Sequence, residues 1–203
     1  MHTTHATAGV VRIGPNSIIQ TVGALNEVYG AEDARAILER IGHSALNEQL
    51  PTDMVDEQVF MALINALRTD LGFEATGKVL ARSGERTADY LLANRIPAPI
   101  RILLPWLPSS LGLRIFLKAI AGHAWTFAGS GRFSYDVGRR GATICLADSP
   151  ECRGMATDAP LCHYYTHCFQ ALLRPLINPR LIVRETACGA MGADACTFEV
   201  TIP

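Results

Sequence analysis

The amino-acid sequence predicts an α+β fold, in which N-terminal helices pack on a small antiparallel sheet of about four strands. Two observations support this class. Up to residue 128, apolar residues recur three and four positions apart, which is typical of amphipathic helices. Beyond Gly129 the period changes to two, which indicates strands, and a helical segment separates the two expected strand pairs.

Helices account for the first part of the chain, and several have a recognisable start or end. Asn16 can cap the first helix, Gly42 follows the second, and Asp53 can cap the third. The expected ranges are 16–27, 31–41, 53–71, 74–94 and 109–127, with a proline-punctuated apolar segment at 97–108. The inner face of the third helix is predicted to consist of Val55, Val59, Phe60, Leu63 and Leu67.

Strands dominate the rest of the chain. The pattern predicts strands at 132–137 and 142–147, and the Gly138-Arg139-Arg140-Gly141 run between them suits a hairpin turn. A helix at 161–174, opened by Pro160, precedes strands at 181–186 and 195–202. We therefore expect a flexible N-terminal arm at 1–15 and one domain at 16–203, with a helical part at 16–128 and a sheet part at 129–203.

Composition argues against several classes of protein. The formal net charge of −1 gives no general attraction to nucleic acid or to anionic lipid, so no nucleic-acid partner is predicted. The apolar stretch 111–127 is interrupted by Arg114, Lys118 and His123, which argues against a membrane-spanning helix. The first nine residues lack the pattern of a signal peptide, so a cytoplasmic location is expected.

The six cysteines all lie after residue 144, and in a reducing compartment such residues are more often thiols or metal ligands than disulfides. Strand alternation places Cys196 on the same face as Phe198, and places Glu185 on the inner face of its strand. Cys162 lies at the start of the helix that packs on the sheet, and Cys188 lies in the turn leading back to Cys196. These four side chains can converge at one end of the sheet.

Spacing alone leaves two interpretations of this group open. A divalent ion would satisfy an inward carboxylate, and zinc suits three sulfurs and one oxygen. Alternatively, Cys162, Cys188 and Cys196 are ordinary small core residues, and Glu185 pairs with an arginine across the sheet. No role is assigned to Cys145, Cys152 and Cys168.

The segment from Pro160 to Val200 contains two motifs, Leu161-Cys162-His163-Tyr164 at the helix start and Glu185-Thr-Ala-Cys188-Gly-Ala-Met-Gly192-Ala-Asp-Ala-Cys196-Thr-Phe198 at the end of the sheet. It resembles the vinyl-4-reductase domain family, whose fold is shared with phenol-sensing regulator domains and a vesicle-tethering subunit. In the phenol sensors, zinc is bound by a helix-start cysteine, a strand glutamate and two cysteines around the final hairpin. The resemblance therefore implies a structural zinc held by Cys162, Glu185, Cys188 and Cys196.

Earlier stretches, Arg12-Ile-Gly-Pro-Asn-Ser-Ile-Ile and His123-Ala-Trp125-Thr-Phe127-Ala-Gly-Ser-Gly-Arg-Phe133, resemble the bacteriochlorophyll-biosynthesis J branch of this family, traditionally called 4-vinyl reductases. This resemblance implies a magnesium tetrapyrrole, such as a Mg-porphyrin or chlorophyllide, bound in the apolar region that contains His123, Trp125, Phe127 and Trp106. His123 would offer a neutral imidazole to the magnesium; a histidine bonded to a backbone carbonyl is the alternative. His163 and His167 are four apart, and we interpret them as a solvated helix face.

Three functions remain open at this point. The first is a tetrapyrrole carrier or assembly factor for other enzymes of bacteriochlorophyll biosynthesis, compatible with a homodimer and with peripheral membrane contact. The second is 4-vinyl (8-vinyl) reduction of divinyl protochlorophyllide or chlorophyllide with an external reductant; no nicotinamide, flavin or iron–sulfur motif is visible, and the catalytic residues are unknown. Gly129-Ser130-Gly131 precedes a strand and so lacks the context of a dinucleotide loop. The third is a small-molecule sensor.

Overall fold

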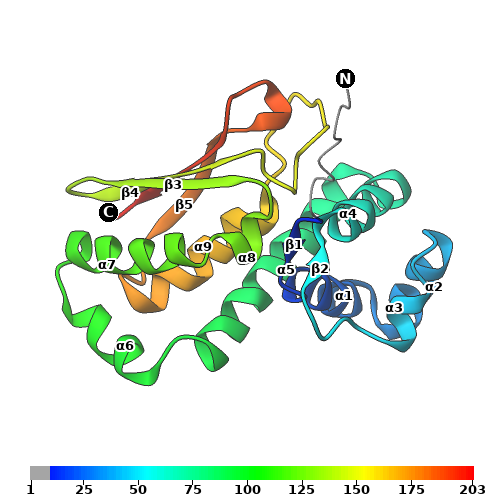
Figure 1. The fold of residues 1–203 in the computed structure, drawn as a ribbon, viewed down its shortest axis with the longest axis horizontal. Helices are drawn as coiled ribbons and strands as arrows, with labels where there is room; N and C mark the ends of the chain where they lie inside the picture. The colour runs from blue at the N-terminus through cyan, green and yellow to red at the C-terminus, as the bar shows by residue number, and fades with distance from the viewer. Residues whose placement is uncertain (1–9) are drawn as a thin grey trace, which may run out of the picture.

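A computed structural model describes residues 10–203 and confirms the α+β class (Figure 1). Its main sheet is antiparallel, with the strand order β3-β4-β6-β5. The helix α9 (His163–Leu176) connects the two strand pairs, as predicted. The four strands are β3 (Arg132–Val137), β4 (Gly141–Ala147), β5 (Ile182–Ala187) and β6 (Cys196–Thr201).

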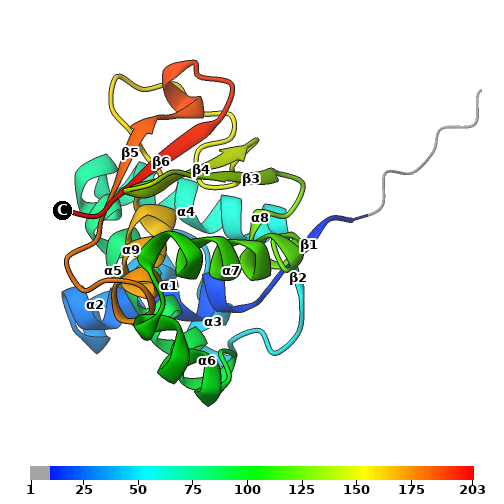
Figure 2. The same ribbon diagram turned by 90° about the vertical axis from the view of Figure 1, so that its left-hand side faces the viewer.

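Helices fill the layer beneath this sheet and the part of the molecule beyond it. In both views α7 and α9 lie against the same face of the sheet, while α5 packs along α9 and α1 (Figures 1 and 2). The remaining helical elements are α1 (Asn16–Tyr29), α2 (Ala31–Arg40), α3 (Ala45–Glu48), α4 (Glu57–Leu71), α5 (Phe73–Asn94), α6 (Ala98–Leu103), η1 (Leu104–Trp106), α7 (Ser109–Gly122), α8 (Trp125–Ala128) and η2 (Gly189–Met191).

The N-terminal part differs from the prediction, because a small second sheet was not anticipated. β1 (Arg12–Ile13) pairs with β2 (Val55–Asp56), so α4 begins at Glu57 rather than at Asp53, and the Asp56 side chain accepts the N–H of Gln58 at 2.9 Å. Ile13 is buried. The expectation of a flexible arm at 1–15 therefore needs correction at the paired residues, whereas residues 1–9 lie outside the described part of the chain.

Two further boundaries need correction. Val59 is exposed, because the later start of α4 leaves Phe60, Leu63 and Leu67 as its inner face. The helix expected over 109–127 is interrupted, because α7 ends at Gly122 and α8 begins at Trp125. Among residues 10–203, no helix combines the length and the apolar character that crossing a membrane requires.

Candidate metal centre

Four cysteine side chains meet at one end of the main sheet. Cys162 directly precedes α9, Cys188 follows β5, Cys196 begins β6, and Cys152 lies in the loop between β4 and α9. All four are buried, and their sulfur atoms lie within 4.8 Å of one another. The Sγ of Cys196 is 3.1 Å from that of Cys162, 3.3 Å from that of Cys152 and 3.9 Å from that of Cys188.

This arrangement fits a tetrahedral metal site. Zinc–sulfur bonds of about 2.3 Å in a tetrahedron separate the sulfurs by about 3.8 Å, so the observed spacing needs only small adjustments. Soft thiolate ligands favour zinc over magnesium or calcium. The four cysteines could therefore hold a metal ion, although the geometry does not identify which one.

Glu185 lies beside the cysteines rather than away from them. Its Oε2 accepts the backbone N–H of Cys162 at 2.9 Å, and its Oε1 is buried with no hydrogen-bond partner among the described residues. Burial and the neighbouring Cys188 thiol raise the pKa of Glu185 to about 8. A buried oxygen without a partner, next to a group of sulfurs, is the environment that a bound cation would satisfy.

Hydrogen bonds among the thiols distribute their protons unevenly. Contacts from Cys152, Cys162 and Cys196 lower the pKa of Cys188, whereas contact with Cys152 raises the pKa of Cys162 and of Cys196. One sulfur of the group is thus readily deprotonated, which is the form that binds metal.

A buried carboxylate holds the loop of Cys152 against α9. Glu151 accepts the backbone N–H groups of Tyr164 and Tyr165 at 2.9 and 3.4 Å, at the positive end of the helix dipole. Burial raises the pKa of Glu151, and the nearby Arg68 opposes that shift. Beside this loop, a surface hollow of about 170 Å³ includes Cys152 and Cys196 in its lining, so the sulfurs lie close to solvent.

The sequence placed three of these cysteines correctly on inward positions but assigned no role to Cys152. This residue lies in an irregular loop, where neither a helical nor a strand period indicates its direction. The only available signal was a further cysteine ten residues before Cys162, in a chain with no expected disulfides. Glu151 and Arg68 gave no signal at all.

The predicted ligand residues do not form one pocket. His123 and Trp125 lie exposed at the end of α7 and in α8, and Trp106 is exposed just before the start of α7. The 14-residue length of α7, about 21 Å, separates Trp106 from His123. Only Phe127 points inward, where it packs on Phe133, Tyr165 and Phe169.

Aromatic side chains fill the space between the sheet and its helices. Phe169 of α9 lies with its ring centroid 5.4 Å from that of Phe198 and 6.3 Å from that of Phe133. Tyr165 stacks on Phe169, and its hydroxyl donates to the carbonyl of Phe127 at 2.8 Å. A large planar ligand therefore has no space beneath the sheet in this conformation.

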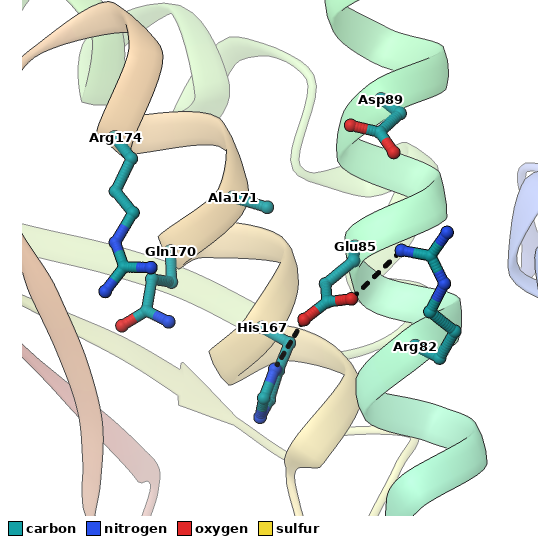
Figure 3. A pocket seen from close by; sticks show the side chains of 7 residues that line it. All are labelled: Arg82, Glu85, Asp89, His167, Gln170, Ala171 and Arg174. Carbon is teal, nitrogen blue, oxygen red and sulfur yellow. Dashed lines mark hydrogen bonds and ion pairs between the residues drawn. The ribbon is translucent and has the colours of Figure 1, made fainter. Parts of the chain in front are cut away.

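The larger hollow, about 240 Å³, lies between α5 and α9 and is polar (Figure 3). His167 Nδ1 is 3.3 Å from Glu85 Oε1, and Arg82 pairs with the other oxygen of Glu85 at 3.0 Å. The histidine thus faces a carboxylate on the neighbouring helix and not His163. The lining consists of Arg82, Glu85, Asp89, His167, Gln170, Ala171 and Arg174.

The Gly129-Ser130-Gly131 run has a structural role that the sequence did not suggest. It precedes β3, as expected, and the backbone N–H and hydroxyl of Ser130 donate to the buried carboxylate of Glu57 at 2.9 and 2.8 Å. Arg153 donates to the same carboxylate at 2.7 Å. Glu57 therefore connects α4 to the sheet and to the loop that contains Cys152.

Comparison with known proteins agrees with this arrangement. The vinyl-4-reductase domain model matches residues 143–202, which include all four clustered cysteines. The "Bacteriochlorophyll synthase 23 kDa chain" of Cereibacter sphaeroides is 40% identical over 189 residues, which cover 93% of this chain and 90% of that protein. The protein of the same name from Rhodobacter capsulatus is 39% identical over 92% of this chain and 85% of its own length.

Solved structures share the fold at low identity. The phenol-responsive sensory domain of the transcription activator PoxR has a TM-score of 0.53 and 16% identity, over 83% of this chain and 89% of that chain. An H-NOX protein from S. oneidensis in the Fe(II)NO ligation state has a TM-score of 0.51 and 10% identity, over 94% and 99%. The fold comparison supports the architecture, and the sequence comparison shows the kinship: the chain belongs to the vinyl-4-reductase domain family, together with the proteins named bacteriochlorophyll synthase 23 kDa chain.

Proposed function

We propose that this protein takes part in bacteriochlorophyll biosynthesis, where it binds a magnesium tetrapyrrole intermediate and presents it to pathway enzymes. The observation that carries this proposal is the extensive similarity to two proteins named for that pathway. The structure supports a binding role because the polar hollows suit no large planar pigment, whereas exposed aromatic side chains lie next to a free imidazole. We place the carrier in the cytoplasm and include a homodimer in the proposal.

The pigment would bind at the end of α7, against His123 and Trp125. His123 Nδ1 lies 2.9 Å from the carbonyl of Ala119, and because a carbonyl only accepts, Nδ1 donates. The neutral ring then has its lone pair on Nε2, which is the nitrogen that can bind a metal ion. Trp125 would cover one face of the macrocycle, and Phe127 would form the floor beneath it. Trp106, at the far end of α7, would contact only a ligand that extends along the helix.

Absorption spectroscopy with a divinyl Mg-porphyrin tests this proposal. A shifted Soret band without chemical change supports carriage, and His123→Ala should weaken binding about tenfold by removing one metal–nitrogen contact. His167→Ala is the matched control, because that histidine faces Glu85 on another side of the molecule. The absence of a spectral shift with the unaltered protein would contradict pigment binding; equal affinities of the His123 variant and the unaltered protein would contradict the assigned ligand.

The second part of the proposal is a structural zinc at the cysteine group. Cys162, Cys188 and Cys196 would each provide one thiolate, and Cys152 the fourth, because its sulfur completes the set within 4.8 Å. Glu185, the fourth ligand expected from the family resemblance, would then accept the N–H of Cys162 and accompany the site. A closed set of four protein ligands holds the ion for stability and leaves no position for substrate.

Cobalt substitution distinguishes the two candidates for the fourth ligand. Visible and near-ultraviolet absorption of bound Co²⁺ reports the number of thiolates, so Cys152→Ser should reduce the thiolate charge-transfer band by about a quarter, whereas Glu185→Gln should retain it. The opposite result would assign the position to Glu185. If neither Zn²⁺ nor Co²⁺ binds to the unaltered protein, the metal proposal is wrong.

Reduction of the 4-vinyl group is the second candidate function, and the traditional name of the resembling proteins favours it. The reaction adds two electrons and two protons to the vinyl carbons, and an external reductant such as NADPH with a partner protein would have to supply them. The same pigment assay separates the candidates, because NADPH-dependent loss of the vinyl group indicates reduction. A sensor, the third candidate, would bind pigment and change its contact with another protein.

A further inference from the structure

One side of the molecule, formed by α6, η1, α7 and α8, exposes an unusual amount of apolar surface. Of the thirteen large apolar side chains that are exposed in the described part of the chain, seven lie between residues 100 and 125. Trp106 is 86% exposed, Ile102 64% and Leu103 62%. The two figures show α6 and α7 together on this side. We call it the α6–α8 face and define it by Ile102, Leu103, Trp106, Leu111, Ile115 and Trp125.

The same segment carries a strong positive charge, which the overall charge conceals. Residues 95–140 contain seven basic side chains and one acidic side chain, whereas the rest of the sequence contains eleven basic and eighteen acidic ones. Arg101 and Lys118 are exposed and belong to none of the ion pairs within residues 10–203. Arg139 and Arg140, in the β3–β4 turn, lie close to the start of α7, because Arg114 contacts the Val137 carbonyl.

Basic and apolar residues alternate along the outward side of α7. Leu111, Arg114, Ile115 and Lys118 follow helical spacing, and all four are exposed, while the opposite side of the helix is buried under the sheet. Such a stripe, with aliphatic stems and tryptophans beside cationic heads, is typical of a helix that lies in the interface of a bilayer.

We propose that the α6–α8 face docks on a membrane surface that contains anionic lipid. Tryptophan side chains favour the headgroup region, and the basic side chains attract anionic headgroups. A second copy of this chain is a poorer occupant, because pairing this face with itself would place one basic surface against another. The contact would be peripheral, with the apolar side chains inserted to the level of the headgroups.

Tryptophan fluorescence provides a direct test, because both tryptophans of the chain lie on this face. Pigment-free protein is titrated with vesicles of phosphatidylcholine, alone or mixed with phosphatidylglycerol, and binding is also measured by flotation. We expect a blue shift of the emission and co-flotation with the anionic vesicles only, weakened by added salt. Because no pigment is present, failure of this test leaves the proposed pigment binding unaffected, and the converse also holds.

Two variants locate the contact. Arg101→Gln with Lys118→Gln should weaken vesicle binding about 25-fold, because each charge near the surface contributes about fivefold. Arg180→Gln with Arg184→Gln is the control, since it removes two exposed charges elsewhere and should leave binding unchanged. Ile102→Ser with Leu103→Ser should abolish flotation without changing the thermal unfolding.

Several results would overturn the proposal. One is the absence of binding to anionic vesicles, and another is an equal loss of binding in the control variant. A third is a dimer in solution that dissociates when Ile102 and Leu103 are replaced, because a second copy would then cover the face. Binding of an acidic protein but of no vesicle would equally reassign the surface.

Discussion

The helices α7 and α9 have the same length and cover the same face of the sheet, but they differ on the side that points away from it. α9 lies between the sheet and α5, so it is buried on two sides, and its N-terminus positions Cys162 and the N–H groups that bind Glu151. α7 has no helix along its outer side, which presents apolar and basic residues. The comparison shows that α9 positions buried chemistry, whereas α7 provides a surface.

The largest expected effect concerns the end of α9. Cys196→Ser should release the metal and reduce the free energy of unfolding by at least about 4 kcal/mol, because three segments lose a shared ligand. Metal analysis and thermal unfolding measure both effects. Cys145→Ser is the control, since this thiol contacts Thr197 outside the cluster. If the Cys196 variant retains its metal and its stability, α9 is not held by a metal centre.

The contact between α5 and α9 should show the next largest effect. A Cβ atom at Gly84 would lie 2.2 Å from the carbonyl oxygen of Tyr164 and 2.9 Å from the nitrogen of Cys168, both of which are backbone atoms of α9. Gly84→Ala should therefore cost about 3 kcal/mol, because neither helix can relax by moving a side chain alone. Denaturant titration measures this cost. A loss below about 1 kcal/mol would show that the two helices are less closely held than described.

Glu57 joins the helical part to the sheet and should show a pH dependence. Burial disfavours its charge, but the hydrogen bonds from Ser130 and Arg153 dominate and lower its pKa below the usual 4.5. The carboxylate is thus more acidic in the folded state, so its contribution is complete above the usual pKa and is lost as the pH falls through the lowered value. Glu57→Gln should cost about 2 kcal/mol at neutral pH and progressively less below pH 4.5. A cost that does not change with pH would contradict this role.

The sequence predicted the features that repeat with a period. Alternation placed Cys196, Phe198 and Val200 on one face, and all three are buried in β6, while Glu185 faces inward in β5. Features set by irregular backbone were missed, because Cys152 lies in a loop and β1 has only two residues. The net charge was an average that concealed the basic segment 95–140, since only the fold shows which charged and apolar residues share a surface.

The smallest expected effect concerns α7. A Cβ atom at Gly122 has no neighbour within 4 Å, so Gly122→Ala should fit without strain. Alanine restricts the unfolded chain and favours the helix, so the free energy of unfolding should increase by about 0.5 kcal/mol. Denaturant titration alongside Gly84→Ala compares the same substitution on a free and on a packed helix. If Gly122→Ala instead destabilises the protein by more than about 1 kcal/mol, something must cover the end of α7 in solution, and the contrast between the two helices would then reflect a partner that remains bound to the isolated protein.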